Sequence, residues 1–199
     1  KFTSYPHGVK IHLEKNIPMG AGLGGGSSDA ASVLIGLNRL WDLNLSQSEL
    51  MSLALELGAD VPFFLFGKNA FVEGIGEQLS YVDLPEEQFL VIFPGRSITT
   101  KDVFQAETLT RDHAPITIFD FIAGSWKDPP FRNDLQSIAS KICPEVNQAL
   151  DWIGQQAPNS VNRMTGSGSS VFAAIPKSFS AHEIDLMLQK LPSGWVGRL

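Results

Sequence analysis

A glycine-rich segment near the start of the chain has the composition of a phosphate-binding loop. Residues 18–28 read PMGAGLGGGSS, with five glycines in seven positions. Glycine loses more conformational freedom on folding than any other residue, so such a cluster indicates positive φ angles or a close approach of the backbone to another group. Backbone N–H groups at a helix N-terminus bind phosphate without a cationic side chain. The segment therefore predicts a phosphate site, to which Ser27 and Ser28 add hydroxyl groups as donors or as a magnesium ligand.

The elements on both sides of this segment would position it. Residues 8–18 alternate apolar Val9, Ile11 and Leu13 with polar side chains, which predicts a half-buried strand. Beyond the glycines, apolar residues recur at helical spacing, which predicts a helix that starts near Ser27 or Ser28. A strand, a glycine loop and a helix N-terminus would then follow one another directly.

Two other glycine loops fit this segment less well. Gly20, Gly22 and Gly25 match the dinucleotide-binding pattern G-x-G-x-x-G. That fold needs an acidic residue about 20 positions later on a second strand, whereas Asp42 falls between two predicted helices. A Walker A loop needs a lysine after its last glycine, and Ser27 stands there. A tight turn that packs a helix on a sheet would need only one glycine. A phosphate loop of a different kind is therefore preferred.

An acidic residue, Asp60, is the candidate for a group that accepts a proton. The segment 46–58 opens with the capping-box pair Ser46 and Glu49 and closes on Gly58, which predicts a helix. Asp60 follows that helix, and Pro62 prevents the helix from continuing. Because the apolar run PFFLF comes next, we expect a partly buried carboxylate. From the local sequence alone, a surface aspartate at a helix end is the alternative.

The rest of the chain predicts short strands and helices. By their patterns we expect two short strands around Gly74 and Gly76, a buried strand over 87–95, a short helix capped by Thr99 or Thr100, two helices within 131–156 split at Pro144, a strand–turn–strand unit over 162–176, a helix over 180–191 with a second capping box, and a last strand at the C-terminal end.

Composition excludes several classes of protein. The 199 residues carry a net charge of -6 and no basic stripe, so we expect no nucleic-acid partner. One cysteine, Cys143, excludes a disulfide framework and fits a reducing compartment. The four histidines show no metal-ligand spacing. No apolar run is long enough to span a membrane. We expect a cytoplasmic protein, from a bacterial cytosol or a plastid stroma, with no membrane partner.

Two motifs in the same order resemble those of the GHMP kinases, a superfamily that phosphorylates hydroxyl groups of small molecules with ATP. PMGAGLGGGSSDAA is similar to the second motif of that family, and MTGSGSSVFA, about 140 residues later, is similar to the third. GADVPFF, FPGRSITTKDVF and RNDL resemble the members whose substrate carries a cytidine diphosphate group. The resemblance covers essentially the whole chain.

This resemblance implies a fold and its ligands. The fold would be a two-domain α/β (α+β) structure, with a ribosomal protein S5-like, ATP-binding domain over residues 1–86 and a ferredoxin-like domain over residues 87–199. ATP would be the phosphate donor, together with Mg²⁺, and the protein would be a monomer or a homodimer. The first motif of the family, with its catalytic lysine, does not match Lys1, Lys10 or Lys15. We therefore expect a piece of a longer protein that, alone, is inactive or impaired.

The resemblance also assigns roles to residues. Asp60 would be the catalytic base. The substrate would contact Thr100, Phe104 and the turn Gly166, Ser167 and Gly168, with Phe104 stacked on the cytosine. Structural alternatives are a Phe104 in the core and a plain β-turn at the glycines. ATP would be bound by the eleven residues of the glycine segment, which are Pro18, Met19, Gly20, Ala21, Gly22, Leu23, Gly24, Gly25, Gly26, Ser27 and Ser28.

Two other functions remain open at this point. Another kinase of the family would act on mevalonate, homoserine or a sugar, and competition by cytidine would separate it from the first interpretation. A non-catalytic nucleotide-binding protein on the same scaffold would need no base, so the presence of Asp60 argues mildly against it.

Overall fold

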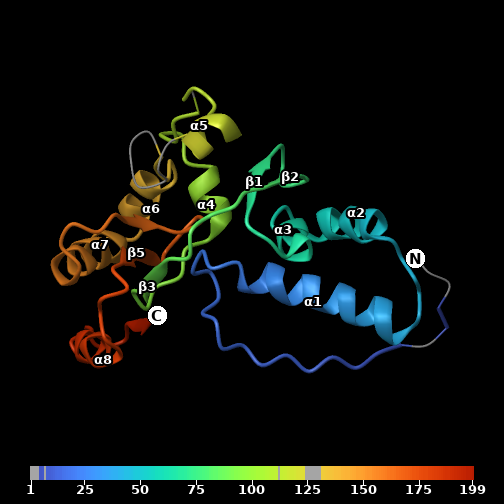
Figure 1. Cartoon of the computed structure of the whole chain (residues 1–199), viewed down its shortest axis with the longest axis horizontal. Coiled ribbons are helices and arrows are strands. Elements are labelled where there is room, and N and C mark those ends of the chain that lie inside the picture. Colours follow the sequence, from blue (N-terminus) through green and yellow to red (C-terminus); the bar gives the residue numbers. More distant parts are fainter. Residues whose placement is uncertain (1–4, 7, 112, 124–130) are drawn as a thin grey trace. The chain divides into compact units, whose positions relative to one another are not determined.

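The computed structural model describes residues 5–6, 8–111, 113–123 and 131–199 (Figure 1). These residues form two compact units. Unit 1 contains Lys1–Ile17 and Gly24–Leu84, and unit 2 contains Pro18–Leu23 and Pro85–Leu199. The glycine segment is thus divided between the units after Leu23. No helix in the described ranges is long and apolar enough to cross a membrane.

The described residues of unit 1 form three helices and a hairpin. The helices are α1 (Gly25–Leu40), α2 (Gln47–Leu57) and α3 (Val61–Phe66), and the antiparallel hairpin consists of β1 (Ala70–Glu73) and β2 (Gln78–Tyr81). The helices pack around a small core of Ala31, Ala54 and Val61. The hairpin confirms the two short strands expected around Gly74 and Gly76.

The helix expected over residues 46–58 is confirmed together with its capping box. The Glu49 N–H donates to Ser46 Oγ at 3.3 Å, and the Ser46 N–H donates to Glu49 Oε2 at 2.8 Å. Ser46 Oγ also donates to Glu49 Oε2 at 2.7 Å, and this bond, together with the one from the Ser46 N–H, holds the pKa of the Glu49 carboxyl below its usual range.

The strand expected over residues 8–18 is wrong. Residues 8–18 form no strand, and Val9, Ile11 and Leu13 are 43%, 54% and 55% exposed. A strand exists only when its N–H and C=O groups bond to a neighbouring strand. No strand in the described part of the chain pairs with this segment, so alternation alone does not produce one.

Unit 2 contains a four-stranded antiparallel sheet. Its strands are β3 (Gln88–Phe93), β4 (Asn162–Met164), β5 (Val171–Ile175) and β6 (Val196–Arg198), in the order β4-β5-β3-β6. The register pairs Leu90 with Ala173 and Ile92 with Val171. All four of these side chains are buried, because the two central strands form the centre of the core.

In the part of unit 2 that the structure describes, five helices accompany this sheet. They are α4 (Thr100–Phe104), α5 (Ile118–Ala123), α6 (Gln136–Ile142), α7 (Glu145–Gln156) and α8 (Ala181–Leu188). Helix α7 packs on the sheet through the buried residues Val146, Ala149 and Ile153 (Figure 1). Pro144 is the N-cap that separates α7 from α6, and Ser180 closes the second capping box. The strands and helices expected for this half are confirmed, and the α+β class with them. Thr99 is the N-cap residue of α4, but its side chain makes no capping hydrogen bond, so the cap expected from Thr99 or Thr100 does not form.

Candidate active site

Two glycine-rich segments that lie 143 residues apart in the sequence meet in unit 2. Gly22 has φ +70°, and a Cβ atom there would lie 2.3 Å from the carbonyl oxygen of Thr165. Thr165 Oγ1 donates to the Gly22 carbonyl at 3.0 Å, and the Ser170 N–H donates to the Ala21 carbonyl at 3.0 Å. Glycine is needed at position 22 because the backbone of 165–168 occupies the space of a side chain.

The same glycine segment is bound on its other side by residues that precede α4. The Ile98 N–H donates to the Gly20 carbonyl at 3.0 Å, and Ser97 Oγ donates to the Met19 carbonyl at 2.6 Å. An open cavity of about 490 Å³ lies over this junction. Its lining consists of Met19, Gly20, Ser97, Ile98, Thr99, Thr100 and Lys101.

The predicted substrate residues of unit 2 lie together. Thr100 Oγ1 and Ser167 Oγ are 2.8 Å apart and share a hydrogen bond, which links the start of α4 to the turn Gly166–Gly168. Phe104 lies four residues after Thr100, on the same side of the short helix. Its side chain is 50% exposed, whereas Val103 fills the core, so Phe104 is not the core residue that the structural alternative required.

In unit 1, the remainder of the glycine segment opens α1. Helix α1 begins at Gly25, two to three residues before the expected start, because Gly24 adopts φ +66° and is itself the N-cap. The Ser28 N–H makes the first helical bond, to the Gly24 carbonyl at 2.9 Å. The N–H groups of Gly25, Gly26 and Ser27 therefore lack helical acceptors, as in any first turn, and no side chain caps them. The positive end of the helix dipole and these donors favour an anion.

Asp60 lies in unit 1, between α2 and α3. Its carboxylate is exposed, so the expectation of partial burial is wrong. The reason is local: α3 starts at Val61, and Val61 and Pro62 enter the core in place of Asp60. Asp60 is the N-cap residue of α3 but makes no side-chain capping bond, which leaves its carboxylate accessible to a ligand.

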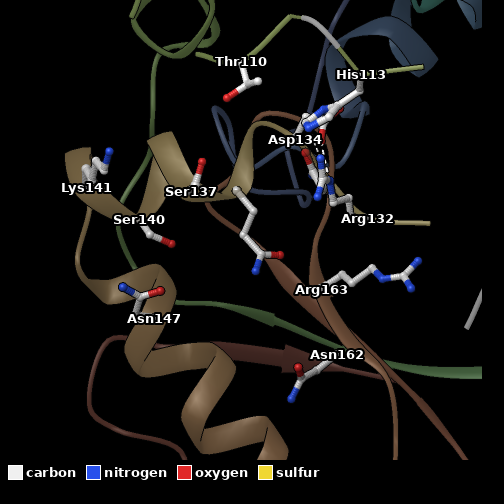
Figure 2. A pocket seen from close by; sticks show the side chains of 12 residues that line it. Thr110, His113, Arg132, Asp134, Ser137, Ser140, Lys141, Asn147, Asn162 and Arg163 are labelled. Carbon is white, nitrogen blue, oxygen red and sulfur yellow. Dashed lines mark hydrogen bonds and ion pairs between the residues drawn. The ribbon is translucent and has the colours of Figure 1, made fainter. Parts of the chain in front are cut away.

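A larger cavity of unit 2, of about 780 Å³, contains none of the predicted site residues. Figure 2 shows its polar lining, contributed by the segments before α5 and before α6, by helices α6 and α7, and by strand β4. Asp134 is bonded there to Arg132, at 2.9 Å from Nε, and to His113, at 3.1 Å from Nδ1 (Figure 2). Burial raises the pKa of the Asp134 carboxyl, but the hydrogen bonds from Arg132 and His113 outweigh it and bring the pKa below its usual range.

Replacing Arg132 by glutamine is expected to raise the pKa of the Asp134 carboxyl toward the usual value, because the cation and its hydrogen bond are lost. A carboxyl group whose pKa is lower in the folded protein than in the unfolded chain stabilises the fold at pH values above its unfolded-state pKa. This stabilisation is lost as the pH falls through the folded-state pKa. Carbon-13 NMR titration of Asp134 measures the shift directly. Lys141→Gln, at an exposed residue of the same cavity, is the control. If the pKa of Asp134 were unchanged in the Arg132 variant, Arg132 would not be a cause of the lowered pKa.

The sequence reasoning missed two residues at this site. Lys101 lines the smaller cavity. It directly follows Thr100, a predicted substrate residue, and this position was the signal in the sequence that could have identified Lys101 as a site residue. Asn133 donates from its side chain to the carbonyls of Met164 and Gly166, and its only signal in the sequence was its place in the RNDL motif.

Comparisons with known proteins identify the family of the chain. The family descriptions "GHMP kinases N terminal domain" and "GHMP kinases C terminal" match residues 1–68 and 119–192. The chain is 58% identical over 198 residues to the 4-diphosphocytidyl-2-C-methyl-D-erythritol kinase of Polynucleobacter asymbioticus, over 100% of this chain and 67% of the relative. It is 52% identical over 200 residues to the kinase of that name from Burkholderia cenocepacia, over 98% of this chain and 66% of the relative.

The structure also resembles a solved one. A crystal structure of 4-(cytidine 5'-diphospho)-2C-methyl-D-erythritol kinase matches with a TM-score of 0.71 and 33% identity, over 92% of this chain and 68% of that chain. This chain thus spans about two thirds of the length of the relatives that it matches. The two family matches, the identity to these relatives and the shared fold give one result: the chain belongs to the GHMP kinase family.

Proposed function

We propose that the protein transfers the γ-phosphoryl group of ATP to the 2-hydroxyl group of 4-diphosphocytidyl-2-C-methyl-D-erythritol, a step of the non-mevalonate isoprenoid pathway. The observation that carries the proposal is the identity of 52–58% to kinases named for this substrate, over essentially the whole chain. Because these relatives are bacterial, the proposed reaction takes place in the cytosol.

The ATP phosphates are assigned to the glycine segment. Residues 24–28 supply the three N–H donors at the start of α1 and the hydroxyl groups of Ser27 and Ser28. Residues 18–23 supply backbone that is fixed by the turn 165–168. Phosphoryl transfer depends mostly on positioning and on stabilising charge, so a rigid cradle of donors is what the reaction needs.

Mg²⁺ would accompany ATP in this site. No group of three or more His, Cys, Asp or Glu side chains suited to a metal ion occurs among the described residues. This composition fits Mg²⁺, which keeps several waters and binds through substrate phosphates with only one or two protein ligands. The hydroxyl group of Ser27 or Ser28 at the start of α1 would be its protein ligand, and the ion would neutralise phosphate charge.

The acceptor side is assigned to Asp60 and to the cluster in unit 2. Asp60 accepts the proton of the substrate's 2-hydroxyl group. At the same time the oxygen of that hydroxyl group bonds to the γ-phosphorus of ATP, and ADP leaves. A tertiary hydroxyl is a weak acid, which makes a positioned base valuable. The exposed ring of Phe104 is suited to stacking on cytosine, and the hydroxyl groups of Thr100 and Ser167 are suited to the polar part of the substrate.

The test is a turnover assay with the intact protein, ATP, Mg²⁺ and the cytidine-bearing alcohol, followed by release of ADP. We expect turnover that cytidine diphosphate inhibits competitively against the alcohol. Mevalonate, homoserine and galactose serve as parallel acceptors. Faster turnover of one of these would replace the proposed substrate, and ATP binding without turnover of any acceptor would favour a non-catalytic nucleotide-binding protein.

A further inference from the structure

Among the described residues, the side chain of Asn133 bonds only to backbone groups, one of them in the glycine turn and one at the end of β4. Its Nδ2 donates to the carbonyl of Met164 at 2.9 Å and to the carbonyl of Gly166 at 2.8 Å. Its Oδ1 accepts from the Leu135 N–H at 2.9 Å, which fixes the amide group from the side of α6. An asparagine amide offers two donors and one carbonyl acceptor, so every group is used.

Gln136 completes this connection three residues later. Its Oε1 accepts from the Met164 N–H at 2.9 Å. Both backbone groups of Met164 and the carbonyl of Gly166 are therefore held by side chains from the start of α6. The Thr165 N–H, in turn, donates to the Ser170 carbonyl at 2.9 Å, which closes the turn on itself.

This arrangement determines where the Ser167 N–H points. In a trans peptide unit the C=O and N–H groups point in opposite directions. Because the Gly166 carbonyl points at Asn133, the Ser167 N–H points to the opposite side, away from that amide. Within the described part of the chain, no acceptor is found for the backbone N–H groups of Gly166 and Ser167. These two donors, beside the Thr100–Ser167 hydroxyl pair, suit an anionic group.

We infer that Asn133 is a positioning residue, which orients the peptide unit 166–167 so that the Ser167 N–H donates to the phosphate-bearing substrate. The inference rests on the proposed function for the identity of that substrate. The orientation itself depends only on contacts within unit 2. Asn133 acts through the turn, and Gln136 supports it by holding Met164.

The test replaces Asn133 by aspartate in the intact protein. The aspartate keeps the acceptor for the Leu135 N–H but places a carboxylate oxygen against two carbonyl oxygens, so the Gly166 carbonyl must turn away. Amide hydrogen exchange at Thr165 and Gly168 is expected to accelerate at least about tenfold, as the loss of a buried hydrogen bond allows. Exchange at Ile153 in α7 is expected to stay unchanged, which separates this local effect from general destabilisation.

Kinetics supply the second readout. KM for the cytidine-bearing substrate is expected to rise at least about tenfold, the effect of one lost hydrogen bond to a charged group, with KM for ATP nearly unchanged. Asn147→Asp makes the same chemical change at an exposed residue of α7 and should leave both values as they were.

Hydrogen exchange and KM together distinguish a failure of this inference from a failure of the proposed function. If the unsubstituted protein does not turn over the substrate, the proposed function fails while hydrogen exchange still tests the orientation of the turn. If exchange at Thr165 and Gly168 is unchanged in Asn133→Asp, the positioning role is refuted whatever the activity. If exchange accelerates but KM for the substrate stays constant, the Ser167 N–H does not bind the substrate.

Discussion

Replacing Asp60 by asparagine is expected to lower kcat of the proposed phosphoryl transfer at least about a hundredfold, the effect of a lost general base. Asparagine has nearly the same shape as aspartate but cannot accept the proton of the acceptor hydroxyl. Both residues are equally good at the N-cap position that Asp60 occupies before α3. The fold should therefore be preserved, and the loss should fall on the chemical step. The measurement is ADP release at saturating ATP and acceptor.

Asp151→Asn supplies the matched control, because Asp151 is an exposed aspartate of α7 that no proposed role involves. It should leave kcat unchanged. KM for ATP should stay nearly constant in the Asp60 variant, since the ATP phosphates are assigned to residues 18–28. A kcat within about threefold of the unsubstituted protein, far from the change expected for a general base, would show that Asp60 is not the base and that its exposed position at a helix start is only structural.

The parts of the fold that could be predicted from sequence are those that depend on near neighbours in the chain. The capping pairs Ser46–Glu49 and Ser180–Glu183 each involve residues three positions apart, and the structure forms both of them. Pro144 separates two helices because a proline has no N–H to donate. Local chemistry of this kind is fully present in the sequence.

The parts that could not be predicted depend on residues far away. The alternation over residues 8–18 has the period of a strand, but a strand also needs a partner, which the pattern cannot supply. Asn133 was missed because its bonds cross 31 and 33 residues and leave no periodic signal. The prediction that Asp60 is partly buried was wrong because a shift of one position at the start of a short helix changes which side chain enters the core. Here Val61 enters it in place of Asp60.

The close packing of Gly22 on the turn 165–168 leads to the largest expected effect on stability. In Gly22→Ala the new Cβ would lie 2.3 Å from the Thr165 carbonyl oxygen and 2.9 Å from the Gly168 nitrogen, both of them backbone atoms that cannot rotate away. The residue must also keep φ +70°, which L side chains disfavour. The free energy of unfolding is expected to fall by about 2–5 kcal/mol, from the strained φ and the overpacking together. Urea unfolding followed by the fluorescence of Trp152 and Trp195, which pack on the core of unit 2, measures this change.

Gly36→Ala provides the opposite case within the same chain. Gly36 lies inside α1, and a Cβ atom there would have no neighbour within 4 Å. Alanine is the better helix former, so this variant should be more stable by about 0.5–1 kcal/mol. If Gly22→Ala were as stable as the unsubstituted protein, the backbones of the two glycine segments could not be in contact. The rigid cradle that the ATP site requires would then lose its structural basis, because residues 18–23 would no longer be held by the turn.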